Sequence, residues 1–474
     1  MNTFALDPTL DPTHGTPAYK SIAHRAKAPL WTLLQDIYQG SEAWLGRDEA
    51  GNLHPTSKAK TYLPREAGED VESYMSRIAR SPFDDRFAQS IRKFVGLILA
   101  NPVKVDASSK VMEHLNKIGA DGSSFGQLMR RIAIAAIRDG HTFVLVDYPD
   151  SRDIVSQENY LASGHQPTWA LYNVLDVVSV VTENQRGRIV PVMVTLRENA
   201  IAQSAFSETP VTRYRVLVPG AWVLHEERKD GQGKLSYPAI KAGTFSINDV
   251  PLKYIPLVCI YGGLKTGFYE SEPSLKSLAD LNMVHYQVKS DHLRKLHLCC
   301  LPVPVLVDSM RSEEEPLTIG PNTFLHVKDP TGSFYWSEPI ATSIEQSRRE
   351  VLDLETAMDF LSASYLENPS DRQAALTTSV QTKQVEASLV GVASSLSEGI
   401  SDCLKLHGAY LGMDGGRVQF SGEILVERGA DSQMMLAYTN LMVAIAGLPP
   451  NLSLFLLQLL TSLGYFPEGL ELPK

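Results

Sequence analysis

The sequence contains little cysteine. Cys259, Cys299, Cys300 and Cys403 are the four cysteines among 474 residues. They form no CxxC pair, and no histidine lies at zinc-finger spacing, so neither a disulfide framework nor a structural zinc site is implied. A chain of this length can bury a substantial core without such cross-links. We therefore predict an ordered protein of a reducing compartment.

A long uninterrupted apolar run is also missing. The most apolar region, residues 436–466, is broken by Gly447-Leu448-Pro449-Pro450-Asn451. Each half is far shorter than the roughly 20 residues that span a bilayer, so we predict two short helices around a turn. Residues 1–29 lack the charged head and apolar core of a signal peptide. No membrane partner is expected.

Positive charge is not in excess. The chain has 44 Lys and Arg against 54 Asp and Glu, a formal net charge of −10. Proteins that hold nucleic acid by general attraction place an excess of basic side chains against the phosphates. The composition, with 43% apolar and 21% charged residues, is that of an ordinary globular protein. A protein that grips nucleic acid tightly is therefore not expected.

The sequence contains partial matches to catalytic motifs, and each of them lacks a required residue. Four stretches each lack a required element of a phosphate loop, a dinucleotide fingerprint, a nucleophile elbow or a zinc-protease motif: Gly263-Leu264-Lys265-Thr266-Gly267, Gly231-Gln232-Gly233, Gly122-Ser123-Ser124-Phe125-Gly126 and His225-Glu226-Glu227. His292 and His297, near Cys299 and Cys300, are five residues apart, whereas a spacing of four aligns two ligands on one helix face. We predict no enzyme activity, catalytic residue, metal or cofactor.

The first 262 residues divide into a helical block and a strand block. Helical periodicity covers 28–38, 70–80, 84–100, 109–118 and 124–139. From His141 to about Gly262 a period near two predicts strands at 142–146, 169–181, 188–196, 212–217, 221–225 and 255–261. This succession predicts an α+β protein with an antiparallel meander. Residues 1–29, rich in Pro and Thr and without periodicity, are predicted to form a mobile arm.

The next block predicts two helices around a small β insert. The first helix begins at Pro273 and has apolar residues at Leu275, Leu278, Leu281, Val284 and Val288. Strand-like runs follow at 303–307, 324–327 and 333–336. The second helix has a heptad-like seam that suits packing on another helix: Val351, Leu354, Met358, Leu361 and Tyr365.

A long helix is predicted after the polar stretch 367–373. It covers 378–411, with one apolar face made by Val385, Leu389, Val392, Leu396, Ile400 and Cys403. Gly391 and Gly399 either permit a bend or mark close packing. A strand at 417–427 precedes the final helical pair.

Several segments together resemble a known family. They are Arg80-Ser81-Pro82-Phe83-Asp84, Ile91-Arg92-Lys93-Phe94-Val95-Gly96, Leu275-Lys276-Ser277-Leu278-Ala279-Asp280-Leu281-Asn282, His285-Tyr286 and Ser290-Asp291. In this order, followed by the helix, insert, helix, loop and long helix, they are similar to tailed-bacteriophage portal proteins, the head-to-tail connectors, of a family catalogued as a phage domain of unknown function. No single segment has a stringent chemical meaning, so the resemblance depends on their co-occurrence.

The resemblance implies a portal fold: an α/β wing, a two-helix stem, a small α/β clip, a long kinked spine helix and a short helical crown. Carried onto this sequence, the parts are a mobile arm at 1–29, the wing at 30–272, stem helices at 273–298 and 341–366, the clip at 299–340, a tunnel loop at 367–377, the spine with its return to the wing at 378–430, and the crown at 431–474.

The resemblance also implies a ring of typically twelve copies at one capsid vertex, through which double-stranded DNA is packaged and ejected. Its expected partners are the major capsid protein, the terminase large subunit and later a neck or adaptor protein. The expected location is the virion, with the host cytoplasm during assembly. Twelve acidic copies would carry a formal charge of about −120, which would keep phosphates centred in a channel.

Candidate site residues follow from these parts. In the tunnel, Arg372, Gln373 and Lys383 are the candidates for brief DNA contacts; the alternative is that Arg372 and Lys383 are only solvated or intersubunit surface charges. On the stem, Lys276, Lys289, Arg348 and Arg349 face DNA, a neighbouring subunit or only solvent. In the clip, Arg311, Glu313, Glu314 and Glu315 form either a docking surface or a solvated loop.

A different non-enzymatic virion component, such as a head-to-tail adaptor or a minor capsid protein, is the alternative. Adaptors are usually much smaller, and their function does not require two amphipathic helices around a β insert ahead of a long helix.

Overall fold

The computed structural model describes residues 13–100, 103–148, 166–204, 206–299, 303–308, 327, 329–337, 341–362 and 375–420. Its α-helices are α1 (Ile22–Gln39), α2 (Ala59–Tyr62), α3 (Val71–Arg80), α4 (Arg86–Ile98), α5 (Ser109–His114), α6 (Phe125–Asp139), α8 (Lys276–Cys299), α9 (Ala341–Leu361) and α10 (Ala375–Tyr410). The mixture of helices and antiparallel strands confirms the predicted α+β class.

Two antiparallel sheets form the larger β-structures of the described chain. One has five strands in the order β12 (Ala239–Thr244), β9 (Ala221–Glu226), β8 (Ser207–Val218), β7 (Arg188–Ser204) and β6 (Val177–Gln185). The other has three, β15 (Leu257–Tyr261), β4 (His141–Asp147) and β5 (Thr168–Tyr172). The predicted meander is therefore confirmed for β6 to β9.

The remaining strands are short two-stranded pairings. They are β1 (Leu45–Arg47) with β2 (Leu53–Pro55), β3 (Lys104–Asp106) with β20 (Arg417–Gln419), β10 (Arg228–Lys229) with β11 (Leu235–Ser236), β13 (Ser246–Ile247) with β14 (Val250–Pro251), β16 (Leu264–Gly267) with β17 (Glu270–Glu272), and β18 (Val303–Val307) with β19 (Ser333–Ser337).

The strand predicted over 169–181 is two strands of different sheets. A turn separates β5 from β6, in which the backbone N–H of Asp176 donates to the carbonyl of Asn173 at 2.9 Å. Asn and Asp favour turns because their side chains compete with the ladder for backbone groups. The period-two pattern on both sides of this turn concealed the change of sheet.

The first described residues lie against the five-stranded sheet. Ala18 is buried beside Val178 and Tyr214, and the backbone N–H of Ser21 donates to the carbonyl of Val178 at 2.9 Å. The Ser21 hydroxyl caps α1, so this helix begins at Ile22, ahead of the predicted start at residue 28. Residues 22–29, assigned to the mobile arm from sequence, are therefore helical; residues 1–12 lie outside the described chain.

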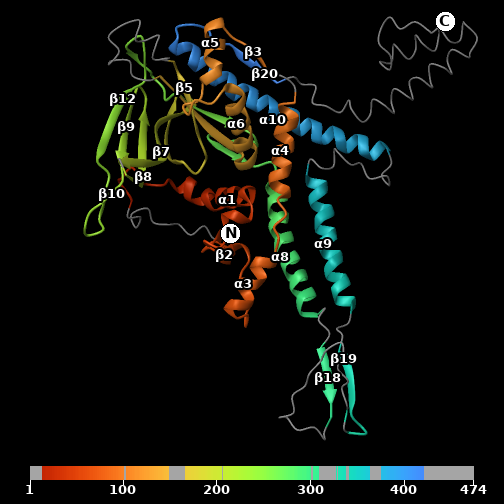
Figure 1. Ribbon diagram of the computed structural model, residues 1–474. Coiled ribbons are helices and arrows are strands. Elements are labelled where there is room, and N and C mark those ends of the chain that lie inside the picture. The colour runs from red at the N-terminus through yellow and green to blue at the C-terminus, as the bar shows by residue number, and fades with distance from the viewer. Residues whose placement is uncertain are drawn as a thin grey trace, which may run out of the picture.

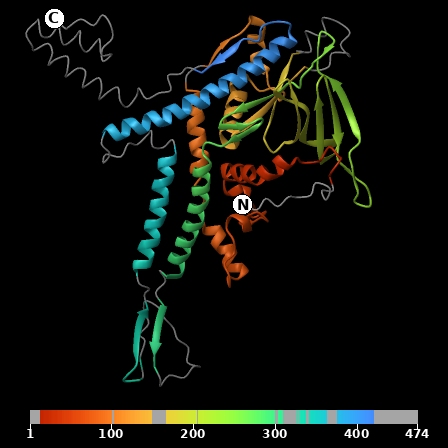
Figure 2. The ribbon, with the colours of Figure 1, turned by 180° about the vertical axis from the view of Figure 1, so that it is seen from behind.

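Helix α10 spans one edge of the molecule. It packs on β15 and on β20, and its predicted apolar face is buried at Leu389, Leu396, Ile400 and Cys403. Both views show it as one rod without a sharp kink, which differs from the kinked helix that was predicted (Figures 1 and 2). At Gly399 an added Cβ would lie 2.9 Å from the Ile260 side chain, so this glycine marks close packing.

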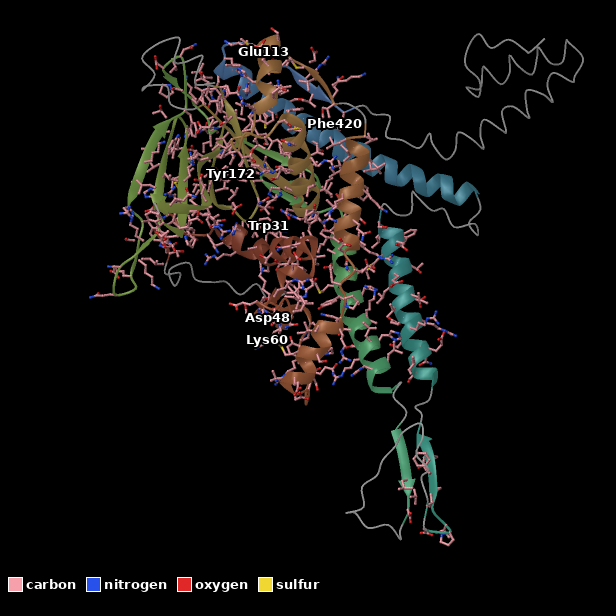
Figure 3. All side chains as sticks on the ribbon, viewed as in Figure 1. Trp31, Asp48, Lys60, Glu113, Tyr172 and Phe420 are labelled. Atoms are coloured by element: carbon pink, nitrogen blue, oxygen red, sulfur yellow. The ribbon has the colours of Figure 1, made fainter. Side chains whose placement is uncertain are left out.

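Helices α8 and α9 form an antiparallel pair in which α8 lies along α4 and α3 and α9 lies on its outer side (Figures 1 and 2). We call this pair the stem, and residues 13–272 with the described part of α10 and β20 the body. The β18–β19 hairpin lies beyond the far end of the stem. Side chains fill the body around the labelled Trp31 and Tyr172, whereas those of α9 extend into open space on the side away from the body (Figure 3).

The apolar faces predicted for the stem are only partly correct. Leu278, Val351 and Met358 are buried, but Val284 is 43% and Leu361 37% exposed. The predicted residue Tyr365, the strand-like run at 324–327 apart from Val327, and the segments after residue 420 lie outside the described chain. No described helix is both long and apolar enough to cross a membrane.

The two glycines of α10 provide a matched pair of substitutions. We expect Gly399→Ala to lower the free energy of unfolding by about 1–3 kcal/mol, because its Cβ would overpack Ile260. We expect Gly391→Ala, where no atom lies within 4 Å of the new Cβ, to raise it by up to ~1 kcal/mol through helix propensity. Chemical denaturation of both variants checks this, and equal effects would contradict the packing explanation.

Candidate functional site: the stem and its junction with the body

The stem is joined to the body by a buried amide. Asn282 of α8 is completely buried; its Oδ1 accepts from the backbone N–H of Phe87 at 2.9 Å, and its Nδ2 donates to the carbonyl of Asp84 at 2.7 Å. Asp85, the N-cap residue of α4, makes no side-chain capping bond. Asn282 therefore satisfies the start of α4 from another helix.

A second polar network lies two turns further along α8. The hydroxyl of Ser81 donates to Ser290 Oγ at 2.8 Å, and the guanidinium of Arg77 lies 3.4 Å from the same oxygen. Arg77 also makes two 2.9 Å hydrogen bonds to the carboxylate of Glu69, and both side chains are almost fully buried. These bonds lower the pKa of Glu69, so the carboxylate is ionised at neutral pH. Buried charges of this kind fix one orientation of α8 on α3.

Aromatic rings fill the space between the two networks. Phe83 lies 5.0 Å from Trp44 and 5.5 Å from Tyr286 of α8, between ring centroids, with both pairs edge to face. Trp44 Nε1 donates to the Tyr286 hydroxyl at 3.4 Å. Such pairs add a geometric preference to the area that they bury.

Helix α9 is attached to this junction through two of its carboxylates, Glu355 and Asp359. Glu355 Oε1 lies 3.3 Å from His285 Nε2 and 3.9 Å from Lys289 Nζ, both on α8. Arg86 at the start of α4 forms ion pairs with Asp359 and, at 3.9 Å, with Glu355. Burial lowers the pKa of His285, so its contact with Glu355 is a hydrogen bond from a neutral ring at neutral pH.

The predicted stem residues fall into two groups. Lys276, in the first turn of α8, and Lys289 are half-buried, and Lys289 lies beside Glu355. Arg348 and Arg349 are 65% and 72% exposed, with Glu345 3.9 Å and 3.5 Å away on the same helix. The structure therefore leaves the two arginines accessible and draws Lys289 into the helix contact.

Of the four residues considered as metal ligands, Cys300 and the side chain of Cys299 lie outside the described part of the chain. His292 Nδ1 lies 3.2 Å from the Ser347 hydroxyl of α9, which gives this ring a structural partner. Within the described residues no group of three or more His, Cys, Asp or Glu is placed to hold a metal ion.

The glycine-rich segment that superficially resembled a phosphate loop is a hairpin. Leu264–Gly267 is strand β16. An added Cβ at Gly263 would lie 2.1 Å from the carbonyl oxygen of Glu272, so a close backbone approach explains this glycine.

The other predicted site residues cannot be placed. Arg372 and Gln373 of the predicted tunnel loop, and Arg311, Glu313, Glu314 and Glu315 of the predicted clip, lie outside the described chain. Lys383 lies on α10, but its side chain is outside the described part.

Sequence reasoning missed the junction, although the signal was present. Asn282, Ser81 and Ser290 lie within the segments on which the family resemblance depended. No chemical role could be assigned to those segments from sequence. A pattern of apolar residues does not reveal which polar residues are buried. Their co-occurrence has a physical reason, because Asn282 and Ser290 of α8 bind the backbone and side chains of residues 77–87 directly.

One family model matches the stem and α10. Residues 274–411 match the family described as Domain of unknown function (DUF4055). The match covers less than a third of the chain. It contains the two-helix stem, its insert and the long helix, and its description assigns no function. No curated protein matches the sequence.

The similar solved structures come from gene transfer agent (GTA) particles. A chain from the virion of the native particle is 11% identical, with 81% of this chain and 93% of that chain covered and a TM-score of 0.40. A chain from the neck of the empty particle, with C6 symmetry, is 11% identical, with 85% and 96% covered and a TM-score of 0.39. One from the native neck, with C12 symmetry, is 10% identical, with 78% and 88% covered and a TM-score of 0.37. Likenesses this weak do not carry a functional argument.

We expect Asn282→Ala to lower the free energy of unfolding by about 2–3 kcal/mol, because it leaves the buried N–H of Phe87 and the partly buried carbonyl of Asp84 without their partner. Ser277→Ala, at an exposed position of the same helix, is the matched control, since both substitutions raise helix propensity. Denaturation midpoints compared at equal slope check the difference. Similar effects of the two substitutions would contradict the junction.

Proposed function

We propose that this chain is the portal subunit of a tailed bacteriophage. Copies of it form a ring at one capsid vertex, and double-stranded DNA passes through the centre during packaging and ejection. The stem helices surround the channel, the body lies outside them, and the β18–β19 hairpin lies at one end.

The observation that carries the proposal is the shape of the stem. Two antiparallel helices of 24 and 21 residues lie side by side, α8 along the body and α9 on its outer side, and the β18–β19 hairpin lies beyond their far end (Figure 1). Within the described residues the lower part of α9 contacts α8 on one side and is otherwise exposed. A helix pair at the edge of the molecule with exposed sides is well suited to packing against copies of itself.

Charge supports a conduit rather than a clamp. The net charge of −10 disfavours tight binding of DNA. The exposed arginines of α9 lie beside Glu345, so the stem presents both signs of charge and not a basic surface. A channel that moves DNA must guide the duplex without holding it, and this balance meets that requirement.

The proposal also assigns a role to each part of the chain. The wing, clip, tunnel loop and crown keep the boundaries that the resemblance implies. The clip is proposed to receive the terminase large subunit first and a neck or adaptor protein later, and the wing to face the major capsid protein. Arg372 of the tunnel loop is proposed to touch DNA briefly. Unchanged packaging by Arg372→Ala particles with intact rings would count against that contact.

The mass of the purified chain in solution, followed by negative-stain electron microscopy, tests the proposal. We expect rings of about twelve subunits with an open centre, as a channel for a duplex requires. A monomer or dimer at every concentration and salt level, or a closed ring without a channel, would contradict it.

A further inference from the structure

Helix α8 has three sides with different surroundings. Tyr286, Ser290 and Arg294 face the body, where Arg294 pairs with Glu66 and Glu69. His285 and His292 face α9. The third side is exposed at Val284, Asp291 and Lys295. We call Val284, Asp291 and Lys295 the α8 flank.

Helix α9 presents a corresponding exposed side. Val351, Glu355 and Met358 face α8 or lie buried against it. About one quarter turn away lie Glu345, Arg348 and Leu352, which are 50%, 65% and 47% exposed. We call these three residues the α9 flank.

The two flanks lie on opposite sides of the stem. A right-handed helix turns clockwise as it recedes from a viewer at its N-terminal end, by about 100° per residue. Because α8 and α9 run in opposite directions, their residues turn in opposite senses when the stem is viewed along its axis. With the body, α8 and α9 in line, the α8 flank faces one side of that line and the α9 flank faces the other.

Residues at equal height on the two flanks are complementary. His285 lies beside Glu355, and His292 lies beside Ser347, so the two contacts fix which residues are level. By this register Asp291 is level with Arg348, and Lys295, one turn lower, is about level with Glu345. Val284 and the neighbouring Val288 bracket the height of Leu352. Each flank therefore has an apolar residue with two charged residues below it. At each height the charge on one flank is opposite in sign to the charge on the other.

We propose that the α8 flank of one copy packs against the α9 flank of the next copy, and that this contact closes the ring. The inference rests on the proposed ring, since copies related by rotation about one axis meet at equal heights through two different surfaces. Opposite charges at the same height then pair between subunits, and Val288, with Val284 about one turn above it, covers Leu352. An apolar centre beside complementary charges gives such a contact both affinity and register.

The same geometry separates the two arginines of α9. Arg348 lies on the α9 flank and faces a neighbouring copy. Arg349 lies about 100° further around the helix, on the side away from α8 and the body, and is 72% exposed. In the ring this side faces the channel.

Charge exchange tests the contact. We expect Asp291→Arg and Arg348→Asp each to raise, by about tenfold or more, the protein concentration at which half of the chain is in rings, because each places like charges level. The double variant restores assembly. Arg349→Asp, with the same charge change one residue away, is the matched control and leaves assembly unchanged. Mass photometry at low salt measures the ring fraction, and circular dichroism confirms that each variant is folded.

A disulfide pair provides an independent readout. Lys295→Cys combined with Glu345→Cys is expected to give a ladder of linked subunits on a non-reducing gel, whereas each single substitution gives the background of the wild type. The two positions lie on opposite flanks of one copy, so a bond within one chain is excluded by geometry.

The outcomes separate the interface from the proposed function. If the wild type forms rings, both single charge variants assemble equally well and the cysteine pair gives no ladder, the proposed interface is wrong and the ring itself stands. Rings lost in Arg349→Asp but kept in Arg348→Asp overturn the assignment of faces. A wild-type chain that never forms rings overturns both proposals.

Discussion

The placement of the stem depends on the burial of Asn282. An amide removed from water costs free energy unless it finds new hydrogen-bond partners, and here the backbone at the start of α4 accepts one bond from Asn282 and donates another to it. Because both bonds need a specific geometry, α8 can lie against α4 in one rotation only. That rotation decides which side of α8 faces the body and which side remains exposed.

The attachment of α9 is less extensive, and this has a consequence for assembly. Its contacts with α4 pass through Arg86 to Glu355 and Asp359, near the end where α9 meets the body. Further down, the described contact is to α8 alone, through His292 and Ser347. The described lower part of α9 thus has little support from its own body, whereas α8 stays attached to it. Packing against neighbouring copies would supply the missing contacts, which links the shape of one chain to the proposed ring.

Much of the fold could be predicted from sequence because it follows regular patterns. The face of α10, with Leu389, Leu396 and Ile400, has a clean helical period and is buried as expected. Val284 fits the apolar period of α8 equally well but is exposed. Periodicity identifies the side of a helix that can be buried, and it does not say whether the same chain or another copy covers that side.

The junction could not be predicted by such patterns. Its important side chains are Asn282, Ser290 and Arg77, which would ordinarily be placed on the surface. Their burial is favourable only because residues more than 190 positions apart satisfy one another. Sequence patterns likewise could not separate the two stem arginines. Arg348 and Arg349 are adjacent polar residues of one helix, and only the relative orientation of α8 and α9 distinguishes them.

A cryo-electron-microscopy map of the assembled protein tests the central claim most directly. We expect a ring in which the α8–α9 pairs surround an open channel, the bodies lie outside them, and Arg349 points to the axis. A ring with the bodies at the centre and the stem helices at the periphery would contradict it.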